Sequence, residues 1–167
     1  NYDPVKSFTP IAPLFWYGPV LICNPSVPAK NVTELVAYAK RQPDGLRYAS
    51  AGIGSGVHFT MEHFAALAGI KTLHVPYKGG APALQDLLGE RVASYFSAPP
   101  TAMPHVEAGR LVPLATTGLT RPAYLPGIPT VAESGFPGFE ALNWYAFVAP
   151  GKTPAPLLER WNQELVK

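Results

Sequence analysis

The sequence predicts an α/β fold with a central sheet flanked by helices. Three observations predict it. Short apolar β-like runs alternate with segments whose apolar residues recur at helical spacing. The 15 glycines and 20 prolines cluster between these segments, where they mark turns. The 167 residues are 47% hydrophobic and 14% charged, which suits one well-cored domain and argues against a disordered chain.

The expected strands are short apolar runs bounded by turn residues. Pro25 ends the first run, and the Pro43–Gly45 turn precedes the second. Right-handed helical crossovers between parallel strands would gather the strand ends at one edge of the sheet, where open α/β sheets bind ligands. The strands that we expect cover residues 21–23, 46–50, 72–75, 92–96, 111–116 and 141–149.

The expected helices follow the strands in turn. Asn31 and Glu34 form a capping-box pattern at the start of the first helix. The second helix has one apolar face and a C-cap glycine at Gly69. Residues 118–140 are rich in proline and glycine and predict a long irregular passage. The helices that we expect cover residues 31–41, 56–68 and 81–88, a short stretch ending near 108, and a last stretch starting at Thr153 and Pro154.

Composition excludes several classes of function. The net charge of +2 is small and no Lys/Arg-rich run is present, so we expect no nucleic-acid partner. Cys23 is the only cysteine, which excludes an internal disulfide and a multi-cysteine metal site. No stretch approaches the roughly 20 apolar residues of a membrane span. The chain opens on Asn1 without Met, so we interpret it as a processed or excised segment.

Residues 48–58, "YASAGIGSGVH", join an expected strand to an expected helix through small residues. A P-loop would need a lysine after its last glycine, and a dinucleotide fingerprint would need its third glycine one residue later. A hydrolase elbow fails because Ile53 stands two residues before Ser55. His58 and His63 are about 140° apart around a helix, so they cannot share a metal ion, and we expect no metal. We interpret His63 and His105 as surface or hydrogen-bonded histidines.

Two interpretations of this loop remain open. The first N–H groups of the following helix attract anions, and Ser50, Ser55 and His58 would add donors. Alternatively, the loop is only a compact turn in which Ser55 caps the helix. The same construction recurs at "PYKGGAP" and weakly at "SAPP", and three converging helix starts would form a carboxylate-sized hollow. Lys78 is open to the simpler interpretation of a solvated surface charge.

Three aromatic residues also allow two interpretations. Trp16, Tyr17 and Trp144 either line a cleft for a flat or aromatic acid or pack at a hinge. The candidate ligand-binding residues are Ser50, Ala51, Gly52, Gly54, Ser55, His58, Tyr77, Lys78, Gly79, Ser97, Ala98 and Trp144. We expect no catalytic residue, because no spacing in the sequence places a base beside a nucleophile, and we expect no cofactor.

Seven stretches carry a resemblance over nearly the whole chain. They are "YDPVKSFTPIAPL", "NPSVPAKNVTELVAYAK", "RYASAGIGSGVHFTMEHF", "HVPYKGGAPALQDLLG", "HVEAGRLVPLATTG", "LPGIPTVAESGFPGFEALNWYAFVAP" and "GKTPAPLLERWN". In these stretches the chain resembles the Bug (TctC-like) family of extracytoplasmic solute receptors, which serve tripartite tricarboxylate transporters. The resemblance implies a periplasmic location, membrane transporter subunits as partners, and a small carboxylate ligand: a di- or tricarboxylate, an amino acid or an aromatic acid.

The resemblance also implies a division into lobes of the periplasmic-binding-protein (type II-like) kind that close on the ligand. Residues 21–140 match the second ligand-binding lobe. Residues 1–20 match a hinge and a first-lobe remnant, and residues 141–167 match a hinge strand and a first-lobe helix. The glycine-rich loop of the first lobe is absent from this sequence, and Ser97–Ala98 stands where relatives often carry Asp-Asn or Asp-Gly.

Two alternatives to transport keep the same architecture. One is an enzyme acting on carboxylates, such as a hydrolase or isomerase, which turnover of a bound acid would favour. The other is a sensory domain that signals to a membrane partner. The enzyme would require a nucleophile with a base in reach, and the sequence shows no such spacing, whereas sensing and transport predict the same sequence features.

Overall fold

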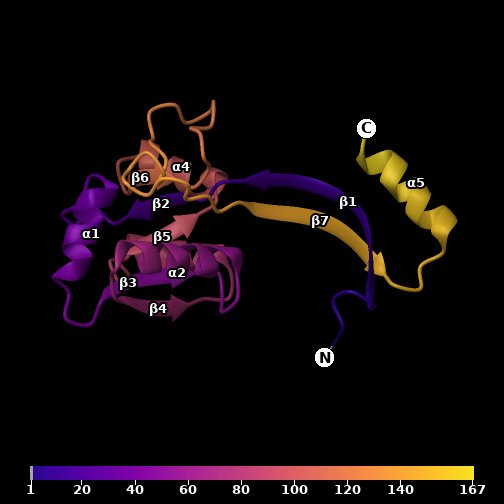
Figure 1. The fold of residues 1–167 in the computed structure, drawn as a ribbon, viewed down its shortest axis with the longest axis horizontal. Helices are drawn as coiled ribbons and strands as arrows, with labels where there is room; N and C mark the ends of the chain where they lie inside the picture. The colour runs from indigo at the N-terminus through magenta and orange to yellow at the C-terminus, as the bar shows by residue number, and fades with distance from the viewer. Residues whose placement is uncertain (1) are drawn as a thin grey trace. The chain divides into compact units, whose positions relative to one another are not determined.

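The computed structural model describes residues 2–167 and separates into two compact units (Figure 1). The larger unit contains residues 18–143, and the smaller unit contains the two ends of the chain, up to Tyr17 and from Trp144. In the larger unit a five-stranded sheet has the order β4-β3-β5-β2-β6. Its elements are β2 (Val20–Cys23), α1 (Val32–Lys40), β3 (Leu46–Ser50), α2 (Gly56–Ala68), β4 (Thr72–Pro76), α3 (Gly80–Leu88), β5 (Ser94–Ser97), α4 (Pro99–Glu107) and β6 (Val112–Thr116).

The α/β expectation is confirmed, but the expectation of parallel pairing throughout is wrong at β2. Strand β3 pairs in parallel with β4 and β5, whereas β2 pairs antiparallel with β5 and β6. The crossover rule gives the handedness of a connection between parallel strands, so it does not fix the direction of β2 relative to the strand that follows α1. The start of β2 at Val20 lies opposite Ser97 and Thr116, at the ends of β5 and β6.

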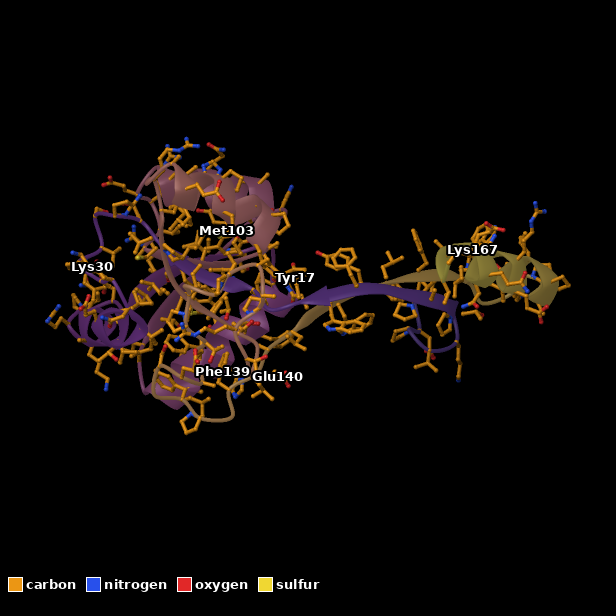
Figure 2. The ribbon with its side chains drawn as sticks, turned by 90° about the horizontal axis from the view of Figure 1, so that it is seen from above. Tyr17, Lys30, Met103, Phe139, Glu140 and Lys167 are labelled. Atoms are coloured by element: carbon orange, nitrogen blue, oxygen red, sulfur yellow. The ribbon has the colours of Figure 1, made fainter. Side chains whose placement is uncertain are left out.

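Helix α2 anchors the core of the larger unit. Its predicted apolar face is buried throughout, and Gly69 ends it in the left-handed conformation at φ +59°. Phe64 of this helix meets Phe96 and Phe139 edge to face. Phe139, labelled in Figure 2, belongs to the irregular passage and is 1% exposed, so that passage closes the core although it forms no helix or strand.

The smaller unit is a two-stranded sheet with one helix. Strand β1 (Phe8–Tyr17) pairs with β7 (Asn143–Pro150), and α5 (Ala155–Leu165) follows. Its small core consists of Ile11, Ala12 and Ala149, with Leu158 packed against it. The Asn162 Nδ2 group donates a 2.6 Å hydrogen bond to the Ile11 carbonyl oxygen, which fixes α5 on β1. Every described residue of α5 keeps at least partial exposure.

Candidate anion-binding site

The loops after β3 and β4 lie side by side at one edge of the sheet. Ser50 and Pro76 are register partners at the ends of the two parallel strands. Beyond them, the Tyr77 N–H donates to the Ser50 carbonyl oxygen at 3.1 Å, and the Gly79 N–H donates to the Ala51 carbonyl oxygen at 3.1 Å. The turns at residues 52–56 and 78–80, which lead into α2 and α3, therefore share a rim, as the anion interpretation requires.

Two glycines shape the first loop. Gly52 has φ +139° and Gly54 has φ +79°, conformations that other residues rarely adopt. A Cβ built on Gly52 would lie 3.3 Å from the Tyr77 carbonyl oxygen, so this glycine also permits the close approach of the second loop. Gly54 has open space around it and is exposed.

The serine hydroxyls of this loop are engaged by the loop itself. Ser55 caps α2, accepting from the His58 N–H at 3.4 Å and donating to the Gly52 carbonyl oxygen at 2.8 Å. The Ser50 hydroxyl, which is 0% exposed, accepts from the Gly52 N–H at 3.1 Å. The capping interpretation of Ser55 is therefore confirmed. What the loop can offer a ligand is backbone N–H groups, because Gly56 and Val57 precede the first intrahelical hydrogen bonds.

His74 is a residue that the sequence interpretation did not place at this edge. Its Nε2 lies 2.6 Å from the Ser50 Oγ atom, and its ring stacks on His58 at 4.2 Å and on Tyr48 at 4.8 Å. Burial lowers the pKa of His74 first, and the neighbouring His58 lowers it further, while Glu62 acts in the opposite direction. A prediction of the parallel register that pairs Tyr48 with His74 would have placed His74 at this edge.

The Ser50–His74 pair corrects one expectation from the sequence. A base does stand beside a serine, because strand pairing brings together residues that are 24 positions apart. Ser50 is fully buried, and its oxygen already accepts from the Gly52 N–H. The Ser50 hydroxyl is therefore engaged by His74 and by its own loop.

In the second loop, the hydroxyl of the predicted residue Tyr77 binds Asp86 instead of facing a ligand. The Tyr77 hydroxyl donates to Asp86 Oδ2 at 2.7 Å, and Arg91 contacts Asp86 Oδ1 at 2.7 Å. Burial and this hydrogen bond raise the pKa of Tyr77 to about 12. Gly79 caps α3 without a side chain at φ +112°, and Lys78 is exposed. The N–H groups of this helix start, rather than the Tyr77 hydroxyl, are the donors available to a ligand.

The third loop is poorer in donors than the sequence interpretation assumed. Ser97 is buried and its hydroxyl donates to the Ala98 carbonyl oxygen at 3.4 Å. Helix α4 begins with Pro99 and Pro100, which carry no N–H, and the Thr101 N–H donates to the Ala98 carbonyl oxygen. The start of α4 therefore lacks the N–H groups of its first two residues, and both prolines are visible in the sequence.

Two further residues meet the edge without having been predicted. The Thr117 hydroxyl donates to the Ala141 carbonyl oxygen at 2.6 Å and also lies 3.2 Å from the Pro19 carbonyl oxygen. The Asn143 side chain lies against the start of α2, since a Cβ built on Gly56 would overlap its Oδ1 atom. Trp144 belongs to the smaller unit and is 73% exposed, and its predicted role stays a prediction.

Other kinds of site find little support in the described residues. Residues 2–167 contain no group of three His, Cys, Asp or Glu side chains that could hold a metal ion. His63 is exposed and stacks on Phe139, and His105 lies within hydrogen-bond distance of Arg110 at 2.6 Å, as expected of surface or hydrogen-bonded histidines. None of the described helices is both long and apolar enough to span a bilayer.

Solved structures define the class to which this architecture belongs. Rpa4515 from R. palustris, solved with adipate, superposes with a TM-score of 0.94 at 36% identity, over 98% of this chain and 55% of that one. The periplasmic binding protein BugD superposes with a TM-score of 0.92 at 34% identity, over 98% of this chain and 55% of that one. The fold is that of a periplasmic binding protein.

The chain belongs to the TctC family, the tripartite tricarboxylate transporter family receptors, whose profile matches residues 1–166. Among curated relatives, a UPF0065 protein from Pseudomonas sp. is 35% identical over 167 residues, 99% of this chain and 50% of that protein. The family resemblance drawn from the sequence is confirmed. The chain spans about half the length of the curated relatives it matches.

Proposed function

We propose that this chain supplies the carboxylate-receiving part of an extracytoplasmic solute receptor that serves a tripartite tricarboxylate-type transporter. The observation that carries the proposal is the hydrogen bond from the Gly79 N–H to the Ala51 carbonyl oxygen, which sets the starts of α2 and α3 side by side. Two helix N-termini at one rim favour a negatively charged group through their free N–H groups and their aligned dipoles. Family membership supports the same role.

The ligand class follows from what this rim can bind. Backbone N–H groups complement a carboxylate, and the exposed Lys78 on the second loop would favour a further negative charge. Rpa4515, which is 36% identical, was solved with adipate, a dicarboxylate. We therefore propose a small organic acid, with di- and tricarboxylates ahead of amino acids and aromatic acids. We propose no nucleic-acid partner, because the net charge of +2 provides no basic surface.

The two units suggest how the rest of the receptor is organised. We propose that residues 18–143 form the ligand-binding lobe, while the smaller unit contains the hinge strands and part of a first lobe. The apolar side chains that β1, β7 and α5 leave exposed support this assignment, because an isolated unit rarely presents so many. A periplasmic location and membrane transporter subunits as partners belong to the same proposal.

The energetics predict weak binding by this chain alone. A helix terminus contributes up to about 2 kcal/mol to an anion, and a charge-assisted hydrogen bond about 1.5–3 kcal/mol. Two or three such contributions only approach the ~8 kcal/mol of a micromolar complex, before the cost of association is subtracted. The remaining contacts would have to come from another part of the receptor.

Titration of adipate into the 15N-labelled chain tests the proposal. We expect millimolar-range shifts of the backbone amides at Gly54, Val57 and Gly80, with a weak calorimetric signal. The Gly45 turn, which precedes β3 at the opposite end of that strand, serves as the internal control. Shifts confined to the Gly45 end, or spread evenly over the chain, would show that the anion does not bind at the α2 and α3 starts.

An enzyme of similar architecture is the second candidate, and the Ser50–His74 pair is the observation that favours it. The burial of Ser50 and the bond that its oxygen accepts from Gly52 speak against it. Incubating the chain with adipate and with its monoethyl ester, and following both by NMR, separates the two functions. A receptor leaves both compounds unchanged, whereas cleavage that a Ser50→Ala variant abolishes would establish an enzyme.

A further inference from the structure

Two imidazole rings stack beside the loop of residues 50–55. The ring centroids of His58 from α2 and His74 from β4 lie 4.2 Å apart, with 14° between their planes. The ring of His74 also stacks on Tyr48 of β3, at 4.8 Å and 14°. His74 is therefore held between two rings, and the stack spans a helix and two strands.

Each imidazole is tied to a different part of the loop. The Gly54 N–H donates to His58 Nδ1 at 3.1 Å, so that nitrogen is an unprotonated acceptor and the proton of a neutral ring sits on Nε2. The Nε2 atom of His74 lies 2.6 Å from the Ser50 hydroxyl, which in turn accepts from the Gly52 N–H. The two rings thus fix the beginning and the tip of the loop.

The surroundings of His74 favour its neutral form. Burial and the charge of His58 lower the pKa of His74, while the carboxylate of Glu62 acts the other way. Glu62 accepts from the Tyr48 hydroxyl at 2.6 Å and from Thr72 Oγ1 at 3.4 Å, so part of its charge is already engaged. Lys78 on the neighbouring loop is exposed. Protonation of one ring makes protonation of the other less favourable.

We propose that His58 and His74 are positioning residues that hold the 50–55 loop in the geometry that presents the α2 start, and that a proton on His58 releases it. Protonated His58 carries a hydrogen on Nδ1, which then faces the Gly54 N–H, so the hydrogen bond between them cannot persist. His74 keeps its bond to Ser50 in either protonation state, because a hydroxyl both donates and accepts. The inference about the loop stands on these contacts, and only its effect on ligand affinity rests on the proposed function.

The loop itself provides the first test. We expect the hydrogen-exchange protection factor of the Gly54 amide, which corrects for the intrinsic effect of pH on exchange, to fall by about 3- to 10-fold from about pH 8 to about pH 5.5. The 15N shifts of the His58 ring should follow the same curve. A protection factor that stays constant while His58 gains its proton would overturn the proposal.

Two substitutions of His58 separate the contribution of its Nδ1 acceptor from that of its stacked ring. His58→Asn retains an acceptor oxygen near the place of Nδ1 and does not titrate, so Gly54 should stay protected across the range. His58→Phe retains the ring but has no acceptor, so Gly54 should exchange quickly at every pH. His63→Asn, on the same helix but stacked on Phe139, is the matched control and should keep the wild-type profile. If the Gly54 amide had the same protection factors across the pH range in His58→Asn and His58→Phe, the role of His58 Nδ1 as its acceptor would be contradicted.

Adipate titrations on the same proteins distinguish failure of the positioning from failure of the proposed function. We expect the ratio of adipate affinities, His58→Asn over wild type, to rise as pH falls, because ionisation of adipate cancels in the ratio. A ratio independent of pH would overturn the positioning role. Absence of adipate binding at any pH, with the Gly54 profile intact, would instead refute the proposed function and leave the positioning in place.

Discussion

The backbone N–H of Gly79 donates a 3.1 Å hydrogen bond to the carbonyl oxygen of Ala51. This bond joins the loop after β4 to the loop after β3, and each loop leads into a helix, α3 at Gly80 and α2 at Gly56. The spacing between the two helix starts is therefore set by backbone geometry. A change to the backbone of either loop should therefore alter the positions of both helix starts.

Gly52→Ala should disturb this link. Gly52 has φ +139°, where an L-residue is strained, and its Cβ would lie 3.3 Å from the Tyr77 carbonyl oxygen. We expect the free energy of unfolding, measured with urea, to fall by about 1–3 kcal/mol, and the Gly79 amide to shift in NMR spectra. Gly127→Ala is the control, because no atom lies within 4 Å of its built Cβ, and it should change stability by no more than about 0.5 kcal/mol. Equal effects of the two substitutions would disprove the strain at Gly52.

Substitutions of Ser55 separate helix capping from anion binding. Both Asn and Asp replace serine well as an N-cap, but the bond from the Ser55 hydroxyl to the Gly52 carbonyl oxygen is disturbed in both, so we expect each variant to lose about 0.5–1.5 kcal/mol of stability. Asp adds a negative charge at the start of α2, where the proposed ligand carboxylate would lie. Adipate affinity should therefore fall by about 10-fold in Ser55→Asp but not in Ser55→Asn. Affinity that is equal in the two variants would place the ligand away from this helix start.

Tyr77→Phe tests the hydrogen bond from the Tyr77 hydroxyl to Asp86. The hydrogen bonds from Tyr77 and then Arg91 hold the pKa of Asp86 below its ordinary value of 3.8. Because this pKa is depressed in the folded state, Asp86 contributes to stability above pH 3.8, and that contribution is lost as pH falls through the folded-state pKa. We expect the variant to raise the pKa of Asp86 toward 3.8, as measured by 13C titration of the carboxyl group. An unchanged pKa would mean that the hydroxyl bonds elsewhere in solution.

Local patterns in the sequence predicted most of the elements because their causes are local. The apolar face of α2, its Ser55 cap and its Gly69 end each depend on residues within a few positions, and all three were found. The direction of β2 depends on where the chain enters the sheet, which no local pattern records. The start of β5 at Ser94, two residues later than expected, reflects pairing with β3.

The candidate site was predicted less completely, because its contacts cross between strands. His74 meets Ser50 and His58 only after β3 and β4 align in parallel register. The hydroxyl of Tyr77 turns to Asp86, a residue that periodicity marks merely as a polar position on a helix. The prolines of α4 are different, since their missing N–H groups were visible in the sequence, although the sequence interpretation counted this loop as a weak third helix start for an anion.

Adjacent threonines at the end of β6 give a matched pair for the last prediction. Thr116 and Thr117 are both buried, with 1% and 0% exposure. The Thr117 hydroxyl donates to the Ala141 carbonyl oxygen at 2.6 Å, whereas the Thr116 hydroxyl has no hydrogen-bond partner among residues 2–167. Valine has nearly the shape of threonine, so replacing either residue changes mainly the hydroxyl.

Thr117→Val should leave the buried Ala141 carbonyl oxygen without this donor and lower the free energy of unfolding by about 1–3 kcal/mol. Thr116→Val removes a buried polar atom that has no partner, so it should be neutral or stabilising by up to about 1 kcal/mol. Urea unfolding of both variants under one set of conditions measures the contrast, and equal m-values would show that the unfolded states are comparable. If Thr116→Val destabilised the protein as much as Thr117→Val, a partner such as a buried water would be bound to the Thr116 hydroxyl, whereas a neutral Thr117→Val would show that residue 141 is held without the Thr117 hydroxyl.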